Sequence, residues 1–371
     1  MTTEFQPRHA PVRKRRRPGK SEALSRWLHA TGLHFLLSNL PQRNSLLVVN
    51  YHRIGDADTA AYAPQVFSAT AEEFQAQMEF IAHRLHPVTL DQALAWVEKS
   101  GVEKSGVEKN GVEQKNANPR PRCHTLVTFD DGYLDNFEVA TPILRKLGMQ
   151  GVFFLPTSFI GTFGLPWWDS IAYIVRNAAN RRFSLQYPAP LSVDIEASGL
   201  FDATYSVQNA YKLPAMKDEP RFLRELETAA GCSRPDTSEE RCFMNWDEAR
   251  RMIHAGMAIG AHTHTHRLLA SLSEGEQLEE LTGCRGILRQ NTGFDPTALA
   301  YPVGLQSSFT DRTKAIAAQA GFRAAFSFYG GVNHPGSVDP YDIVREGVYG
   351  QSVERFRTQA AMAAVRGRYW P

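Results

Sequence analysis

Two adjacent carboxylates, Asp130 and Asp131, stand where a run of β-prone residues ends. The segment Leu126–Phe129 is typical of a buried strand, and Gly132 allows the chain to turn directly after it. At the carboxyl end of a strand, where α/β folds gather their ligands, both acids can reach one cavity. Two like charges this close are costly unless a cation or a shared proton relieves them. The segment therefore predicts a cation site, with further ligands elsewhere in the chain.

A second group of candidate ligands is the run HTHTH at residues 262–266, directly after the predicted strand 257–261. Histidines four residues apart lie on one side of a helical turn, so His262 and His266 can face one ion while His264 faces away. Two imidazoles and one carboxylate leave positions open for water and substrate, as catalytic metal sites do. Zn²⁺ is the first candidate, and Co²⁺, Ni²⁺ or Fe²⁺ also fit nitrogen and oxygen donors. A histidine-rich surface turn is the competing interpretation.

Strands and helices alternate around these groups. The segments 126–131, 140–146 and 151–156 form a βαβ pattern, which predicts parallel strands. The other predicted strands are Leu46–Tyr51, Met257–Ala261, Thr297–Ala300, Ala324–Phe328 and Ile343–Val348. Polar residues gather where these strands end, which indicates an α/β barrel.

The composition is that of a soluble globular protein, with 43% hydrophobic and 22% charged residues. A net charge of +2 indicates no general affinity for nucleic acid or membranes. No apolar run reaches the length of a transmembrane helix. The four cysteines show no C-x-x-C spacing, so we expect free thiols, with a Cys232–Cys242 disulfide as the alternative.

The predicted organisation is one barrel with an N-terminal extension and two insertions. Residues 1–20 are basic and are expected to be disordered, and residues 21–44 are expected to form an amphipathic helix. The barrel is predicted over residues 45–350. It is interrupted by a low-complexity insertion at 99–120 and by a weakly patterned, irregular insertion at 181–243.

Residues 351–371 are predicted to form a C-terminal helix or tail. The chain shows no clear signal peptide, so we expect a protein of the cytoplasm or of the inner membrane face. The basic tail and the first helix allow peripheral association with a membrane. The sequence does not indicate an oligomeric state.

The motif TFDDG at residues 128–132, together with His262-Thr263-x-x-His266, closely resembles the motifs of carbohydrate esterase family 4, the NodB-homology polysaccharide deacetylases. The resemblance extends over most of the chain, from about residue 46 to residue 348. It implies a distorted (β/α) barrel, here of about seven parallel strands.

The resemblance also implies a site. One divalent metal would be bound by Asp131, His262 and His266, and Asp130 would be the catalytic base. The segment Val48–His52 resembles the N-terminal strand end of a permuted subgroup that includes poly-β-1,6-N-acetylglucosamine deacetylases.

In that subgroup the histidine is the general acid, which implies this role for His52. Arg345 resembles the family arginine that holds the catalytic aspartate. The competing interpretation of His52 is a histidine that caps a strand. The competing interpretation of Arg345 is a surface salt bridge.

A run near the end of the barrel resembles the family motif whose backbone N–H binds the oxyanion: Tyr301, Pro302, Val303 and Gly304. Val303 replaces the usual aromatic residue, and Ala300 stands where an arginine often opens the motif. A valine offers no aromatic face for stacking on a sugar ring. Trp167 is a further candidate for lining a sugar cleft.

The function that the resemblance implies is metal-dependent removal of N-acetyl groups from an N-acetylhexosamine polysaccharide or glycan intermediate of cell-surface or exopolysaccharide metabolism. The alternatives are an O-acetyl esterase or small-amide hydrolase on the same fold, and a non-catalytic glycan-binding protein. The expected partner is an N-acetylated glycan. Nucleic acid is not expected, because no reading module accompanies the basic run.

Overall fold

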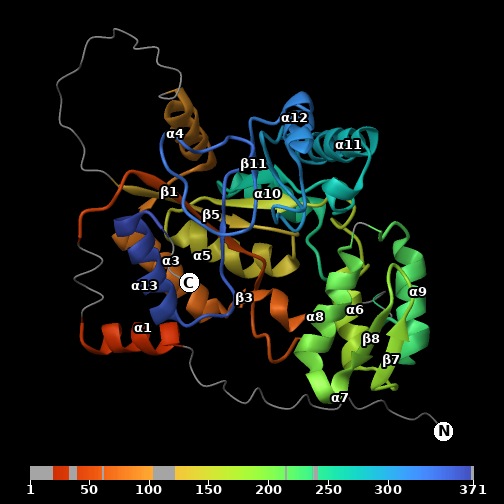
Figure 1. The fold of residues 1–371 in the computed structure, drawn as a ribbon. Helices are drawn as coiled ribbons and strands as arrows, with labels where there is room; N and C mark the ends of the chain where they lie inside the picture. Colours follow the sequence, from red (N-terminus) through yellow and green to blue (C-terminus); the bar gives the residue numbers. More distant parts are fainter. Residues whose placement is uncertain are drawn as a thin grey trace, which may run out of the picture.

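Figure 1 shows the computed structural model of the chain. It describes residues 20–32, 40–60, 62–102, 122–213, 215–235, 237 and 241–368. Nearly all of the predicted basic tail, most of the low-complexity insertion and residues 33–39 of the predicted first helix lie outside the described residues.

A single parallel sheet forms the centre of the molecule. Seven strands lie in the order β11-β10-β9-β6-β5-β1-β12, and β4 pairs with β5 beside this path. The strands are β1 (Ser45–Tyr51), β4 (His86–Pro87), β5 (Cys123–Phe129), β6 (Gly151–Leu155), β9 (Ala258–Ala261), β10 (Ala298–Ala300), β11 (Ala324–Phe326) and β12 (Glu346–Gly347). The sheet curls into an open half-barrel, which confirms the predicted distorted (β/α) barrel.

The strand register brings the ends of neighbouring strands level with one another. Tyr51 at the end of β1 pairs with Phe129 at the end of β5, and all seven β1 residues are buried. Leu155 at the end of β6 pairs in the same way with Ala261 at the end of β9. The residues that follow these strands therefore emerge at one edge of the sheet, where parallel sheets bind ligands.

Helices cover the outside of the sheet (Figure 1). They are α3 (Ala71–Arg84), α4 (Leu90–Val102), α5 (Thr141–Lys146), α10 (Trp246–His254), α11 (Glu274–Thr292), α12 (Asp311–Gln319) and α13 (Val353–Arg366). Capping boxes begin α3, α10 and α11, which satisfies the free N–H groups of their first turns. The first helix, α1 (Lys20–Ala30), packs against α13 and ends before Gly32, which has a φ of 72°.

The segment around the predicted second insertion forms a unit beside the sheet, drawn in green in Figure 1. A hairpin of β7 (Arg182–Leu185) and β8 (Leu191–Asp194) precedes α7 (Ile195–Ser198), α8 (Leu200–Tyr211) and α9 (Glu219–Ala230). With α6 (Trp167–Arg176) these elements enclose an apolar cluster of their own. The segment is more regular than its weak patterning indicates, because its apolar residues are divided among short elements that bury one another.

Two further strands form a separate, two-stranded sheet. The short strand β2 (Arg53–Ile54) continues from β1 and pairs with β3 (Phe67–Ala69), and a one-turn helix at Pro64–Val66 precedes β3. All four cysteines are free thiols, so the alternative Cys232–Cys242 disulfide is not formed. In the described part of the chain no helix combines the length and the apolar character needed to cross a membrane.

Candidate metal centre and the cleft beside it

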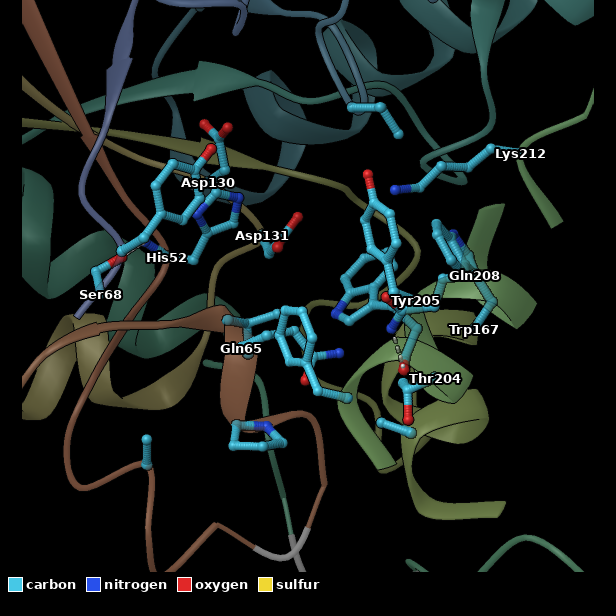
Figure 2. Close-up of a pocket in the computed structure, with 18 of the residues that line it drawn as sticks. His52, Gln65, Ser68, Asp130, Asp131, Trp167, Thr204, Tyr205, Gln208 and Lys212 are labelled. Carbon is cyan, nitrogen blue, oxygen red and sulfur yellow. Dashed lines mark hydrogen bonds between the residues drawn. The ribbon is translucent and has the colours of Figure 1, made fainter. Parts of the chain in front are cut away.

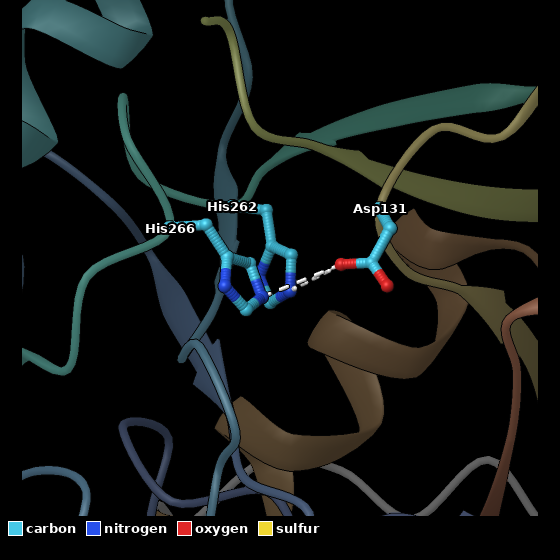
Figure 3. Close-up of side chains that lie close together, drawn as sticks. All are labelled: Asp131, His262 and His266. Carbon is cyan, nitrogen blue, oxygen red and sulfur yellow. Dashed lines mark ion pairs between the residues drawn. The ribbon is translucent and has the colours of Figure 1, made fainter. Parts of the chain in front are cut away.

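Three buried side chains from two strand ends form a candidate metal site (Figure 3). Asp131 follows β5, and His262 and His266 follow β9. The Asp131 Oδ1 atom lies 3.6 Å from Nε2 of His262 and 3.3 Å from Nε2 of His266. This oxygen is buried and accepts no hydrogen bond from the described residues. A buried carboxylate oxygen that faces two imidazole nitrogens fits a divalent cation.

The histidine segment is a loop and not the helical turn that its spacing predicts. Thr263 and His266 have left-handed φ values of 63° and 58°, and this backbone turns both ligand histidines toward Asp131. His264 faces away as expected, with Nδ1 2.8 Å from the Thr157 hydroxyl.

Two contacts hold the loop in this conformation. Glu280 of α11 accepts hydrogen bonds of 2.8 Å from the N–H groups of His264 and Thr265. Nδ1 of His262 lies 2.8 Å from the carbonyl oxygen of Ala300, an acceptor, so this nitrogen carries the proton and Nε2 is free to bind an ion.

Burial disfavours charge throughout this group. It raises the pKa of Asp131 well above its ordinary value, and the nearby carboxylates of Asp130 and Asp169 raise it further. Burial lowers the pKa values of His262 and His266, so both imidazoles are neutral and can donate a lone pair. Metal ligation needs neutral imidazoles and an ionised carboxylate. The positive charge of a bound cation would lower the pKa of Asp131 and favour its ionised form.

We expect Asp131→Asn to gain stability relative to the wild type as pH rises, provided that metal is absent. The raised pKa means that the folded wild type keeps a proton on Asp131 at pH values where the unfolded chain has lost it. The free energy of unfolding of the wild type then falls by up to about 1.4 kcal/mol per pH unit, whereas asparagine does not titrate. Urea unfolding of both chelated proteins from about pH 4.5 to 7 measures this difference.

With Zn²⁺ added, the wild type should instead be more stable than Asp131→Asn at neutral pH. The variant lacks one ligand, so metal binding raises its free energy of unfolding by less. A stability difference that is independent of pH in the chelated proteins, and unchanged by Zn²⁺, contradicts the assignment of Asp131.

The other acid, Asp130, is held by a buried arginine. Arg345, which precedes β12, donates to Oδ1 of Asp130 at 2.7 Å and to Oδ2 at 2.8 Å, and its side chain is fully buried. Asn50 of β1 donates to the same Oδ2 at 3.1 Å and accepts from Arg345 at 2.8 Å. Burial alone would raise the pKa of Asp130, but the charge and the hydrogen bonds of Arg345 outweigh it and hold the pKa well below its ordinary value.

The structure therefore gives the two neighbouring acids different states. Asp130 is an ionised carboxylate with a fixed orientation, and it lies 4.0 Å from Nε2 of His262 through Oδ2. Asp131 has no such partner and faces the two histidines. The predicted Asp130–Arg345 contact is confirmed, and the surface salt bridge is excluded because Arg345 is buried.

His52 lies at the end of β1 and lines the same cleft as both acids. Its backbone is fixed by hydrogen bonds to Ser68 and from Asn136, at 3.0 and 2.7 Å. Burial lowers the pKa of His52 to about 4, while the negative charge of Asp130 acts in the opposite direction. The imidazole is therefore neutral at neutral pH.

The run at residues 301–304 reaches the cleft at one position only. Val303 lines the cleft with a φ of 63°, and its N–H donates to no acceptor among the described residues. Tyr301 points into the core, where its ring stacks on Phe309 at 4.3 Å. The N–H of Gly304 donates to the Pro302 carbonyl at 2.7 Å. Of the four residues of this run, Val303 is the one that lines the cleft, whereas the Tyr301 side chain lies in the core.

Tryptophans of α6 form the wall behind His266. Trp168 lies 4.6 Å from the His266 ring and donates through Nε1 to the Tyr133 hydroxyl, which in turn donates to the buried Asp169. Trp167 lines the cleft as expected and stacks on Tyr211 at 4.1 Å. Helix α6 thereby supports His266, one ligand of the candidate metal site, and Tyr211 of the second insertion packs on the same helix.

The candidate metal site opens into a cleft of about 820 Å³ (Figure 2). One end holds His52, Asp130 and Asp131, and the other end reaches α8. The sequence analysis did not predict the roles of Asn50 and Glu280 in holding the site, or that α8 lines the cleft. Of these, only Asn50 could have been found from the sequence, because it directly precedes the Tyr51-His52 strand end that resembles the family.

Comparisons with known proteins agree with this geometry. The family model described as polysaccharide deacetylase matches residues 193–325, which include His262, His266 and Val303 but not Asp130. The chain is 43% identical over 47 residues to YxkH of Bacillus subtilis (strain 168), whose name assigns it to the polysaccharide deacetylases. This match covers 13% of the chain and 16% of YxkH.

Two solved structures share the fold at low sequence identity. IcaB from Ammonifex degensii is similar with a TM-score of 0.52 and 19% identity, over 86% of this chain and 98% of that chain. The Streptococcus pyogenes deacetylase PplD, in complex with acetate, is similar with a TM-score of 0.50 and 14% identity, over 84% and 96% of the two chains. The chain contains a polysaccharide deacetylase domain of the NodB-homology, carbohydrate esterase family 4 type.

Proposed function

We propose that the protein is a metal-dependent hydrolase that removes N-acetyl groups from an N-acetylhexosamine glycan. The observation that carries this proposal is that a candidate metal site and an ionised carboxylate lie next to each other in one cleft. Asp131, His262 and His266 can hold a divalent cation, and the clamped carboxylate of Asp130 lies directly beside them. The polysaccharide deacetylase match supports the glycan substrate.

The donor set of one carboxylate and two imidazoles suits Zn²⁺ first, and Co²⁺, Ni²⁺ or Fe²⁺ as alternatives. When bound, such an ion supplies Lewis acidity and lowers the pKa of water toward neutrality. The chain's own residues then have to remove a proton from water, orient the acetyl group and protonate the departing amine.

Asp130 is the proposed acceptor of the proton from water. Its two hydrogen bonds from Arg345 and one from Asn50 fix the carboxylate and keep it ionised. The same contacts make it a weak base, so its contribution depends on position more than on basicity. The Val303 N–H is the proposed donor to the oxyanion, since it has no acceptor among the described residues.

His52 is the proposed donor to the departing amine, but its lowered pKa sets a condition on this role. A neutral imidazole must receive a proton before it can donate one. The proton that Asp130 accepts from the attacking water is the one that His52 receives and passes to the amine, so each turnover moves one proton from water to the leaving group. His52 therefore completes a transfer that begins at water and ends at the amine.

We expect His52→Gln to lower kcat for an N-acetyl substrate by about a hundredfold. Hydrolysis of an acetate ester with a good leaving group, such as 4-nitrophenyl acetate, should fall by much less, because that leaving group needs no proton. Acetate or nitrophenol release by the purified variant measures both. Equal losses on the two substrates would contradict the assignment of His52 as the acid.

A screen of acetate release tests the function as a whole. N-acetylglucosamine oligomers of different linkage should release acetate, whereas exclusive activity on O-acetylated sugars or small amides would establish the esterase or amidase alternative. Binding of these oligomers without any acetate release would support the glycan-binding alternative instead.

A further inference from the structure

The wall of the cleft farthest from the candidate metal site is one face of α8. Residues at helical spacing along α8 line the cleft: Leu200, Phe201, Thr204, Tyr205 and Gln208. The opposite face of α8, with Ala203 and Val207, is buried in the apolar cluster that α8 shares with α6. The buried face of α8 thus packs on α6, whereas the face with Phe201 and Tyr205 lines the cleft and is exposed to solvent.

The cleft face of α8 has the side chains that sugars need. Phe201 and Tyr205 are each 55% exposed although they lie beside an apolar cavity. Exposed aromatic rings can stack on the apolar faces of sugar rings. Thr204 already donates to the Leu200 carbonyl and Gln208 to the Trp168 carbonyl, so their oxygens are left to accept hydrogen bonds from sugar hydroxyl groups. Large exposed aromatic residues at a cleft are typical of a binding surface.

The side chain of Lys212, directly after α8, adds a positive charge to the cleft. Lys212 is half-buried, lines the cleft and forms no ion pair with a described carboxylate. In Figure 2 its amino group extends into the space between the labelled residues. Burial lowers its pKa, and no carboxylate offsets this effect.

Arg176 at the end of α6, the helix that packs against α8, is a second such cation. It is half-buried, lines the same cleft and donates to the Ala60 carbonyl, with no carboxylate partner in the described structure. The exposed Asp58 also lines the cleft, but it pairs with neither cation. Lys212 also lies 5.8 Å from the centre of the Trp167 ring, a contact that offsets only part of the cost of its burial. An anion bound in the cleft would offset the remaining desolvation of both cations.

We infer that the substrate carries an anionic group, a carboxylate or a phosphate, that Lys212 binds while the α8 face contacts the sugar rings. This inference rests on the proposed function and narrows its substrate to an acidic glycan. Arg176 adds positive charge to the same cleft. Lys212 is a specificity-determining residue in this account and takes no part in the chemical step.

The test compares three acetylated substrates of equal length: a neutral N-acetylglucosamine oligomer, one that contains a uronic acid, and one that ends in a phosphate. At low salt the wild type should favour at least one acidic oligomer over the neutral one by about tenfold in KM. Lys212→Gln should raise the KM for that oligomer about tenfold more than the KM for the neutral one. Lys212→Arg should keep most of the preference, and 0.5 M NaCl should weaken it.

Lys146→Gln is the matched control, because Lys146 is exposed on the outer helix α5 and lies away from the cleft residues. The carboxylate and phosphate oligomers distinguish the two sources of charge. Equal use of neutral and acidic oligomers by the wild type, or equal KM changes in Lys212→Gln, overturns the inference while acetate release leaves the deacetylase function intact. Absence of acetate from all three substrates overturns both.

Discussion

Asp130→Asn should lower acetate release from an N-acetylated oligomer by about 10³-fold or more. Asparagine keeps the size of the side chain but cannot accept the proton from water. Arg345 and Asn50 hold the Asp130 carboxylate in its orientation. No other described carboxylate shares these contacts, so none is placed to take over its role. Asp131 is the nearest candidate, and it faces the two histidines instead.

The measurement is kcat at saturating substrate, together with metal content and circular dichroism at low temperature. Asp295→Asn is the control, since Asp295 pairs with Arg285 on the surface, outside the cleft. The control should change kcat by less than about twofold. An Asp130→Asn enzyme that binds metal, folds and keeps more than about a tenth of wild-type turnover would refute the base assignment.

Arg345→Met should both destabilise the protein and reduce its activity. Removal of one partner from a buried ion pair leaves the other charge uncompensated, at a cost of about 3–5 kcal/mol. Arg345 also donates to the Ser327 carbonyl and to Asn50, so its loss disturbs three strand ends. The free energy of unfolding from urea titration at neutral pH measures the effect, and Arg345→Lys should recover only part of it.

A double-mutant cycle separates this effect from simple loss of packing. The variant that carries both Asp130→Asn and Arg345→Met has no buried charge of the pair. It should therefore be less destabilised than the sum of the two single variants by about 1–3 kcal/mol. Additive effects would show that the two side chains are not coupled.

The Asp130–Arg345 pair also predicts how stability and activity depend on pH. Arg345 holds the pKa of Asp130 below its ordinary value, so the stabilisation from the pair is present at neutral pH and is lost as pH falls through that lowered pKa. In Arg345→Met, burial raises the pKa of Asp130. The acidic limb of the activity profile should then move to higher pH.

Local sequence patterns predicted the strand ends and most of the charged groups at them. A run of apolar residues followed by Asp-Asp-Gly is specific, because the acids, the turn and the strand come from adjacent positions. The level ends of β1 and β5 then follow from the parallel register, which places His52 beside Asp130. The Arg345 contact was predictable through the family resemblance alone, since 215 residues separate it from Asp130.

Other parts of the site depend on contacts that no local pattern shows. The side of the strand end that Tyr301 faces is set by its pairing with β11 and by its packing on Phe309. The histidine loop is held by Glu280 of α11, which accepts from the N–H groups of the two residues between the left-handed Thr263 and His266. The α8 wall comes from a segment with weak patterning, because one face of this helix packs on α6 and the other lines the cleft.

Metal content and activity, measured on the same protein sample, test the central claim most directly. Wild-type protein stripped with a chelator should release no acetate from N-acetylglucosamine oligomers, and one equivalent of Zn²⁺, Co²⁺, Ni²⁺ or Fe²⁺ should restore activity. His262→Ala and His266→Ala should bind the ion weakly and stay inactive at that concentration. Full acetate release by the metal-free wild type, or full restoration in both histidine variants, would contradict the account.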